Sequence, residues 1–115
     1  MVDYSIERVV AGKKDRFEAL LADTIMSSIR DLLGESSMRA ILYHLNLEQV
    51  GRDPQAFDKR LRELLSAPAS IIEETIIKEL FKRLDLFYSP KGAFDFQRYV
   101  SAAWEFYGSS EKKAA

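Results

Sequence analysis

Cysteine is absent from this chain of 115 residues, and glycine, proline and histidine are scarce, with five, three and one copies. Without cysteine, the sequence offers no disulfide, no thiolate metal site and no cysteine nucleophile. It also has no apolar run close to the roughly 18–20 residues that span a bilayer, and no apolar signal segment at its N-terminus. We therefore expect a cytoplasmic protein with no membrane segment.

A strong excess of either charge is missing as well. Seventeen Lys and Arg residues face eighteen Asp and Glu residues, which gives a net charge of -1 at pH 7. A typical nucleic-acid-binding domain is basic overall, so the composition does not favour that class. The hydrophobic fraction of 47% is normal for a globular protein. We expect a single helical domain over 13–108, preceded by an arm or short helix over 1–12 and followed by a flexible tail over 109–115.

Apolar residues recur at steps of three and four along most of the chain, which places them on one face of a helix. The stripe that contains Phe17, Leu21 and Ile25 is an example. No clean strand-like alternation stands out. The pattern predicts an all-α protein, a compact bundle of about five helices. The expected helices are 15–33, 35–45, 54–65, 68–86 and 94–107.

Several residues mark the expected helix boundaries. Gly34 suits the position after a helix, because positive φ carries no Cβ penalty in glycine. Asp53 can accept a bond from a free N–H group, and Pro54 loses no bond in the first turn, so the pair predicts a helix start. Pro68 repeats this signal, and Asp95 is expected to cap the last helix. The helix from Pro68 has the widest apolar face and is expected at the centre of the core.

Residues that carry catalysis or bind metals are few. His44 is the single histidine, whereas a metal site needs several converging ligands. Glu73 and Glu74 are adjacent on one helix and point in different directions, so we expect them on a solvated face. Ser36 and Ser37 lie two turns before His44, about 11 Å along an ideal helix, which is too far for a hydrogen bond. We expect no metal, no cofactor and no enzymatic activity.

A local basic cluster surrounds the helix expected over 54–65. Such a cluster can contact DNA phosphates, and the alternative function is therefore a DNA-binding regulator that uses this helix. Acidic Asp58 and Glu63 are interleaved with the cations, which is typical of an ordinary solvated helix. We therefore do not expect nucleic acid as the partner. The four cations are Arg52, Lys59, Arg60 and Arg62.

Aromatic residues crowd the region from 87 to 107. They either fill the core between the last two helices or form an exposed band for a partner, since aromatic side chains dominate interface energetics. The same apolar surplus favours a homodimer through the N-terminal segment or the last helix. The expected partner-binding residues are Tyr43, His44, Tyr88, Trp104 and Tyr107.

A spaced pattern of helix starts and apolar positions runs from Leu32 to Phe106. Its members are Leu33-Gly34-Glu35-Ser36, Ala40-Ile41, His44-Leu45, Asp53-Pro54, Phe57, Leu61, Leu64, Ile71-Ile72-Glu73, Ile76-Ile77, Leu80, Phe94-Asp95-Phe96 and Tyr99-Val100. The pattern resembles the Nitrosopumilus output domain, a small archaeal α-helical family. The resemblance implies a helical intracellular protein that serves as an output module in signalling, and it brings no catalytic residues. We therefore predict a non-enzymatic interaction module that binds a protein partner in a regulatory or signalling setting.

Overall fold

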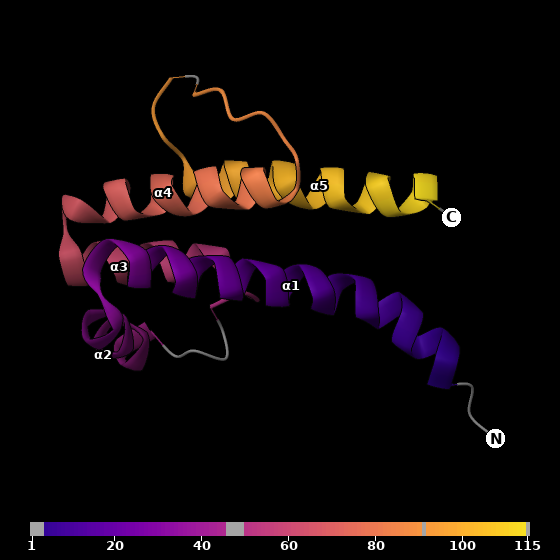
Figure 1. Cartoon of the computed structure of the whole chain (residues 1–115), viewed down its shortest axis with the longest axis horizontal. Coiled ribbons are helices and arrows are strands. Elements are labelled where there is room, and N and C mark those ends of the chain that lie inside the picture. The colour runs from indigo at the N-terminus through magenta and orange to yellow at the C-terminus, as the bar shows by residue number, and fades with distance from the viewer. Residues whose placement is uncertain (1–3, 46–49, 91, 115) are drawn as a thin grey trace.

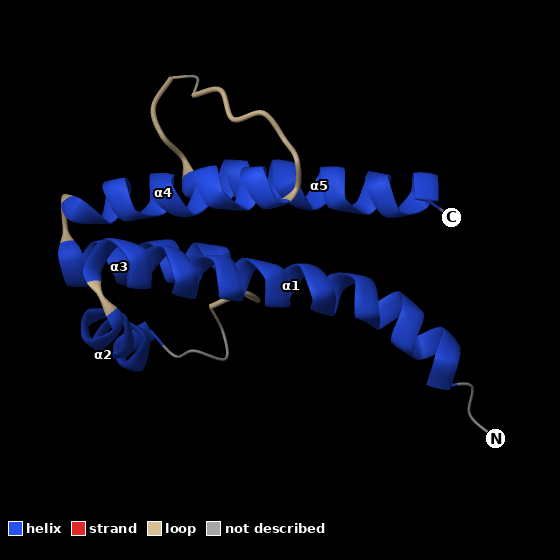
Figure 2. Cartoon of the chain, in the orientation of Figure 1, coloured by secondary structure: helices blue, strands red, loops and turns tan. Residues whose placement is uncertain are grey.

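The computed structural model describes residues 4–45, 50–90 and 92–114, and within them the side chains of 12–45, 50–90 and 92–107. These residues form helices and loops, and the described ranges contain no strand (Figure 2). The prediction of an all-α bundle is thus confirmed. The helices are α1 (Tyr4–Leu33), α2 (Glu35–Leu45), α3 (Pro54–Leu65), α4 (Pro68–Arg83) and α5 (Phe96–Ala114).

Helix α1 is the longest of the described helices, and α4, α2 and α5 pack along it. Helix α4 runs antiparallel to α1, with its first turns beside the C-terminal end of α1 (Figure 1). Helix α4 also contacts α3 and α5, while α2 packs on α1 and touches α3. The C-terminal end of α5 and the N-terminal end of α1 lie on the same side of the molecule (Figure 1).

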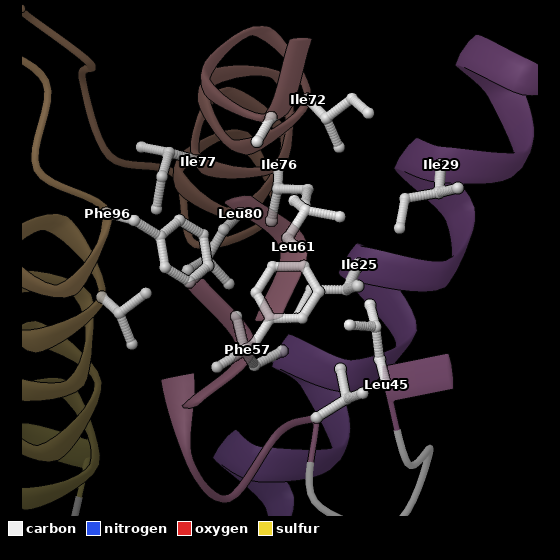
Figure 3. Close-up of a cluster of buried hydrophobic side chains, with 14 of the residues drawn as sticks. Ile25, Ile29, Leu45, Phe57, Leu61, Ile72, Ile76, Ile77, Leu80 and Phe96 are labelled. Atoms are coloured by element: carbon white, nitrogen blue, oxygen red, sulfur yellow. The ribbon is translucent and has the colours of Figure 1, made fainter. Parts of the chain in front are cut away.

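The core lies where α4 meets α1, α3 and α5, as the wide apolar face of α4 predicts. Ile72 and Ile76 of α4 extend toward Ile29 and Ile25 of α1, and Phe96 of α5 closes the cluster (Figure 3). Burial of such side chains stabilises the fold by roughly 1.5–3 kcal/mol each. The buried apolar residues are Phe17, Leu21, Ile25, Ile29, Met38, Ile41, Leu42, Leu45, Val50, Phe57, Leu61, Ala69, Ile72, Ile76, Ile77, Leu80, Phe81, Phe96, Val100 and Ala103.

The predicted boundary residues act as expected. Gly34 has a φ of 91° and separates α1 from α2. The Asp53 carboxylate accepts a 3.0 Å hydrogen bond from the Ala56 backbone N–H at the start of α3. Asp95 accepts a longer bond, 3.3 Å, from the Arg98 N–H at the start of α5. These contacts satisfy N–H groups that have no partner within the helix.

Four boundaries differ from the prediction, and the smallest difference is the start of α5 at Phe96 rather than at 94. Helix α1 begins at Tyr4, so most of the segment expected as a separate arm or short helix continues into the helix expected from 15, and 1–3 lie outside the described residues. Gly12 costs about 1 kcal/mol in a helix interior, which does not interrupt one that is otherwise free of breakers. Helix α5 continues to Ala114, so 109–114 is helical rather than a flexible tail, because its Glu, Lys and Ala residues favour helix.

Helix α4 ends earlier than the prediction of 86. Asp85 adopts a left-handed φ of 59°, and the Leu86 N–H donates a 2.7 Å hydrogen bond to the Phe81 carbonyl. This bond across six residues is the arrangement that ends many helices, usually with glycine in the left-handed position. Because aspartate occupies that position here, the sequence carries no clear stop signal. The chain then leaves the bundle as the loop between α4 and α5 (Figure 1).

Candidate functional site

A groove of about 610 Å³ lies between the C-terminal end of α2 and one face of α3. We call it the α2–α3 groove. It combines the histidine that the sequence singled out with part of the basic cluster, two features that were expected to serve different functions. The residues that line it are His44, Leu45, Ala56, Lys59, Arg60, Glu63 and Leu64.

The charges in the groove come from α3. Lys59 and Arg60 are exposed, and neither has an ion-pair or hydrogen-bond partner among the residues with described side chains. Glu63 is also exposed and lies one turn further along the helix. Among the described side chains, the groove therefore offers two cations without an ion pair and one carboxylate one turn away from them.

The apolar part of the groove has a buried floor and an exposed edge. Leu45 is buried at the end of α2 and belongs to the core. Leu64 exposes 42% of its surface, although it follows the apolar spacing of α3. An exposed leucine beside a groove adds apolar contact area that no other described part of the chain covers.

Tyr43 and His44 stand together at the end of α2. Their rings meet edge to face at 5.6 Å, and Tyr43 exposes 84% of its surface. His44 is exposed and lines the groove, whereas Tyr43 lies beside it in the chain without lining it. An aromatic side chain left this exposed is free to contact another molecule, so the two residues predicted to bind a partner do share one accessible place.

Arg62 faces the opposite way, toward α4. Its guanidinium donates hydrogen bonds to Asp58 at 2.7 Å, to Ser70 at 3.2 Å and to Glu73 at 3.1 Å. Arg62 therefore links α3 to α4 and is not available with Lys59 and Arg60. The basic cluster that the sequence grouped together is split by the structure.

Glu73 corrects the expectation of a solvated face. Its side chain is 0% exposed, and one carboxyl oxygen, Oε2, has no hydrogen-bond partner among the described residues. Burial raises the pKa of Glu73 from its ordinary 4.5 to about 9, and the neighbouring Asp58 carboxylate acts in the same direction, against Arg62. Glu73 is thus protonated at neutral pH, and Arg62 balances its charge chiefly against Asp58.

The sequence did contain a signal for the burial of Glu73. The residue is one turn after Ala69 and one turn before Ile76 and Ile77, which places it on the apolar face of α4. All three neighbours are fully buried. Spacing therefore identifies its face correctly, whereas the charged residue type suggested the opposite.

Arg52, the fourth member of the basic cluster, lies away from the α2–α3 groove. Its Nε is 3.8 Å from the Glu18 carboxylate of α1. Gly51 beside it is buried, and a side chain there would meet the backbone carbonyl of Glu18, so the segment before α3 lies directly on α1. The groove is consequently left with Lys59 and Arg60 alone from the predicted set.

Tyr88 belongs to an aromatic cluster at the loop between α4 and α5. Its ring packs on Phe81 at 5.8 Å and on Tyr99 at 5.3 Å, and Phe94 stacks on Tyr99 at 5.5 Å. The Tyr88 hydroxyl donates to Glu74 at 3.3 Å, and burial, with the charge of Glu74, raises the pKa of Tyr88 to about 12. Tyr88 thus ties the loop to α4, as the core-filling alternative predicts.

Trp104 and Tyr107 pack between α5 and α1. Both rings contact Phe17, at 5.2 Å and 5.5 Å, and they also contact each other at 6.3 Å. Trp104 still exposes 36% of its surface, and Tyr107 is partly buried. The predicted partner-binding residues therefore occupy three separate places, of which only the end of α2 borders the α2–α3 groove.

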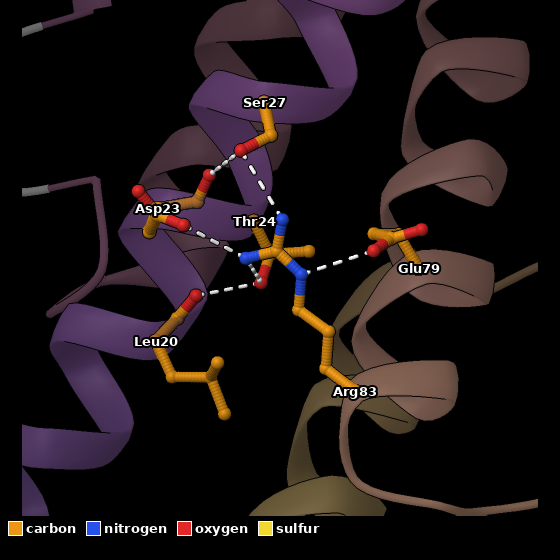
Figure 4. A network of polar contacts seen from close by, with 6 residues as sticks. All are labelled: Leu20, Asp23, Thr24, Ser27, Glu79 and Arg83. Atoms are coloured by element: carbon orange, nitrogen blue, oxygen red, sulfur yellow. Dashed lines mark hydrogen bonds and ion pairs between the residues drawn. The ribbon is translucent and has the colours of Figure 1, made fainter.

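Arg83 forms a second polar network, between α4 and α1 (Figure 4). It bonds Asp23 at 2.8 Å, Thr24 at 3.2 Å, Ser27 at 3.2 Å and Glu79 at 3.0 Å. Thr24 in turn donates to the Leu20 carbonyl. The network joins α1 and α4, which share the most extensive helix packing in the described chain. We assign it to the stability of the bundle.

Among the described side chains, the two most exposed large apolar residues outside the predicted site set are Phe87 and Ile71. Phe87 exposes 88% of its surface in the loop after α4, and Ile71 exposes 68% in the first turn of α4. Ile71 falls off the apolar stripe of its helix, which the spacing alone would have shown. Phe87 lies in a loop, where spacing gives no information about exposure.

Neither a metal-binding cluster nor a membrane span emerges from the part of the chain that the structure describes. Its His, Asp and Glu residues form no group of three that could hold an ion. None of the helices in that part is long and apolar enough to cross a bilayer. The chain matches no family model, no curated protein and no solved structure.

Proposed function

We propose that the chain is a non-enzymatic interaction module that binds a protein partner through the α2–α3 groove. The observation that carries the proposal is the joint exposure of Tyr43, His44 and Leu64 near two exposed cations that form no ion pair with any described side chain. Interfaces take most of their binding energy from a few aromatic, apolar and arginine side chains that become desolvated. The groove supplies Arg60 and Leu64, and the exposed Tyr43 lies next to its lining residue His44.

A regulatory or signalling role is part of the same proposal. It is supported by the resemblance of the apolar and helix-start pattern to the Nitrosopumilus output domain, which implies an output module that passes a signal by contact. The resembling pattern includes His44-Leu45 and Leu64, which line the groove. The output surface and the groove would then be the same place.

The alternative is a DNA-binding regulator that uses the basic face of α3. The exposure of Lys59 and Arg60, which pair with no described side chain, favours it, because exposed cations can contact phosphates. Against it, Arg62 bonds Asp58 and Glu73, and Arg52 lies beside Glu18. Two cations neutralise few phosphates. Binding of a protein partner is therefore better supported than binding of DNA.

Site-directed photo-crosslinking in the cells of origin tests the proposal. A photoreactive residue replaces Leu64 at the groove, and a matched one replaces Arg98, an exposed position on α5. We expect a discrete protein adduct from position 64 that position 98 does not give and that Tyr43→Ala weakens. Equal adducts from both positions, or adducts with nucleic acid alone, would contradict the proposal.

Self-association is a separate expectation for the last helix and the N-terminal segment. On α5, Trp104 and Phe106 retain exposed surface that a second copy could cover. Light scattering at high micromolar concentration reads the mass directly, and a monomer mass there rules out the homodimer.

A further inference from the structure

We propose that the occupant of the α2–α3 groove is an amphipathic segment of a partner protein that carries acidic side chains beside apolar ones. This inference rests on the proposed function and adds the chemistry of the partner. Its basis is the charge and polarity of the groove, which has two exposed cations with no partner among the described side chains and exposed apolar surface next to them.

The first step concerns charge. Among the cations of α3, Arg62 already bonds two acidic residues, whereas Lys59 and Arg60 have no partner among the described side chains. Lys59 and Arg60 are adjacent in the chain and line the same groove. A carboxylate placed there meets two donors, and a lysine or arginine in the same place would be repelled.

The second step concerns position along the groove. Glu63 lies one turn beyond Lys59, so the negative charge is displaced along α3 from the two cations. An acidic side chain of the partner is favoured when it lies next to Lys59 and Arg60, and it is disfavoured when it lies next to Glu63. Like charges brought together in an interface cost several kcal/mol, which restricts the orientation in which an acidic segment binds.

The third step concerns apolar contact. Leu64 is adjacent to Glu63 and half-exposed, and Leu45 and Ala56 form further apolar lining. A partner segment therefore needs apolar side chains close to its acidic ones. An amphipathic helix presents both within neighbouring turns, and helices commonly bind other proteins by laying an apolar face in a groove.

The test uses a designed peptide of about 16 residues, roughly four helical turns, with leucines on one face and glutamates flanking them. A matched peptide carries lysine at every glutamate position. Both carry a fluorescent label, and anisotropy measures their affinity for the full chain at low and physiological salt. The proteins compared are the wild type, the variant Lys59→Glu/Arg60→Glu, the neutral variant Lys59→Gln/Arg60→Gln and the control Arg98→Glu.

We expect the glutamate peptide to bind the wild type at least about tenfold more tightly than the lysine peptide, since complementary charge sets specificity. The charge-reversed variant should invert this preference, the neutral variant should remove it, and Arg98→Glu should leave it within about twofold. The neutral pair keeps the test valid if charge reversal prevents folding, and circular dichroism reports folding for each variant.

Equal affinity for the two peptides, an unchanged preference in both α3 variants, or tighter binding of duplex DNA than of the glutamate peptide would overturn the inference. The glutamate peptide could fail to bind while position 64 still crosslinks to a partner segment that lacks acidic residues. That result would refute only the proposed charge of the partner. Absence of the crosslink would refute the proposed function itself, so the two failures are distinguishable.

Discussion

The two sides of α3 carry the same kinds of residue in opposite situations. On the side toward α4, Arg62 bonds Asp58 and the buried Glu73. On the side toward α2, Arg60 is exposed and has no partner among the described side chains. Residues that are two positions apart on a helix differ by about 200° around its axis. Arg60 and Arg62 therefore point in nearly opposite directions.

The comparison shows that proximity in the chain is a poor guide to a shared role. The inner side of α3 bonds to α4 through Arg62. These contacts contribute to the free energy of unfolding. The outer side leaves Lys59, Arg60 and part of Leu64 exposed to water, and we propose that these side chains contact a partner. Variants on the two sides should accordingly affect different measurements.

Leucines on the two sides should differ most. Leu61 is 0% exposed, so Leu61→Ala removes buried methyl groups and leaves a cavity. We expect a loss of about 2–5 kcal/mol in the free energy of unfolding, measured by urea denaturation. Leu64→Ala serves as the matched control and should lose less than about 1 kcal/mol, because 42% of the residue is already exposed to water. Similar losses at both positions would contradict the assignment of the two sides.

The two arginines should differ next. Arg62→Ala removes hydrogen bonds to Asp58, Ser70 and Glu73. We expect it to lower the free energy of unfolding by about 1–3 kcal/mol, because these bonds are charge-assisted. Arg60→Ala should change the free energy of unfolding by no more than about 0.5 kcal/mol, as is usual for an exposed side chain without partners. The same urea experiment at pH 7 compares them. A larger loss from Arg60→Ala would mean that the outer side also stabilises the fold.

Glu73 should make the inner side sensitive to pH. Its pKa is about 9 in the folded chain and 4.5 when freely solvated, so folding favours the protonated form. The stability from this group is complete below pH 4.5 and is lost progressively as the pH rises to about 9. Glu73→Gln keeps the shape without titrating, so its stability relative to the wild type should rise by about 1.4 kcal/mol per pH unit as the pH approaches 9.

Urea denaturation of both proteins at several pH values from 5 to 9 measures the effect of Glu73. The difference in unfolding free energy between the variant and the wild type should grow with pH across this window. A constant difference would show that Glu73 has an ordinary pKa in the folded chain. Other titrating groups are shared by the two proteins, so they cancel in the comparison.

The helical architecture was predictable because its signals are local. Gly34, Asp53-Pro54 and Asp95 act at the ends of their own helices, and each does what its chemistry predicts. The early end of α4 escaped prediction because Asp85, not glycine, occupies the left-handed position. Aspartate adopts that conformation only sometimes, so its presence in a sequence is a weak stop signal.

The candidate site was predictable only in pieces. Tyr43 and His44 were singled out for one function and Lys59 and Arg60 for another, yet the groove places His44 beside the two cations. Tyr88 and Trp104 were grouped with the first pair, but they pack in separate aromatic clusters. Residue types suggest what each side chain can do, and they do not indicate which distant helix it meets.

Apolar spacing and end residues were sufficient to divide this chain into helices, because a helix forms through bonds between residues a few positions apart. The fates of Arg60, Arg62 and Glu73 depended instead on how α2, α3 and α4 pack against one another. Burial and ion pairing between helices arise from atoms far apart in the chain. Those contacts, invisible in any local pattern, made one side of α3 a structural joint and left the other open for a partner.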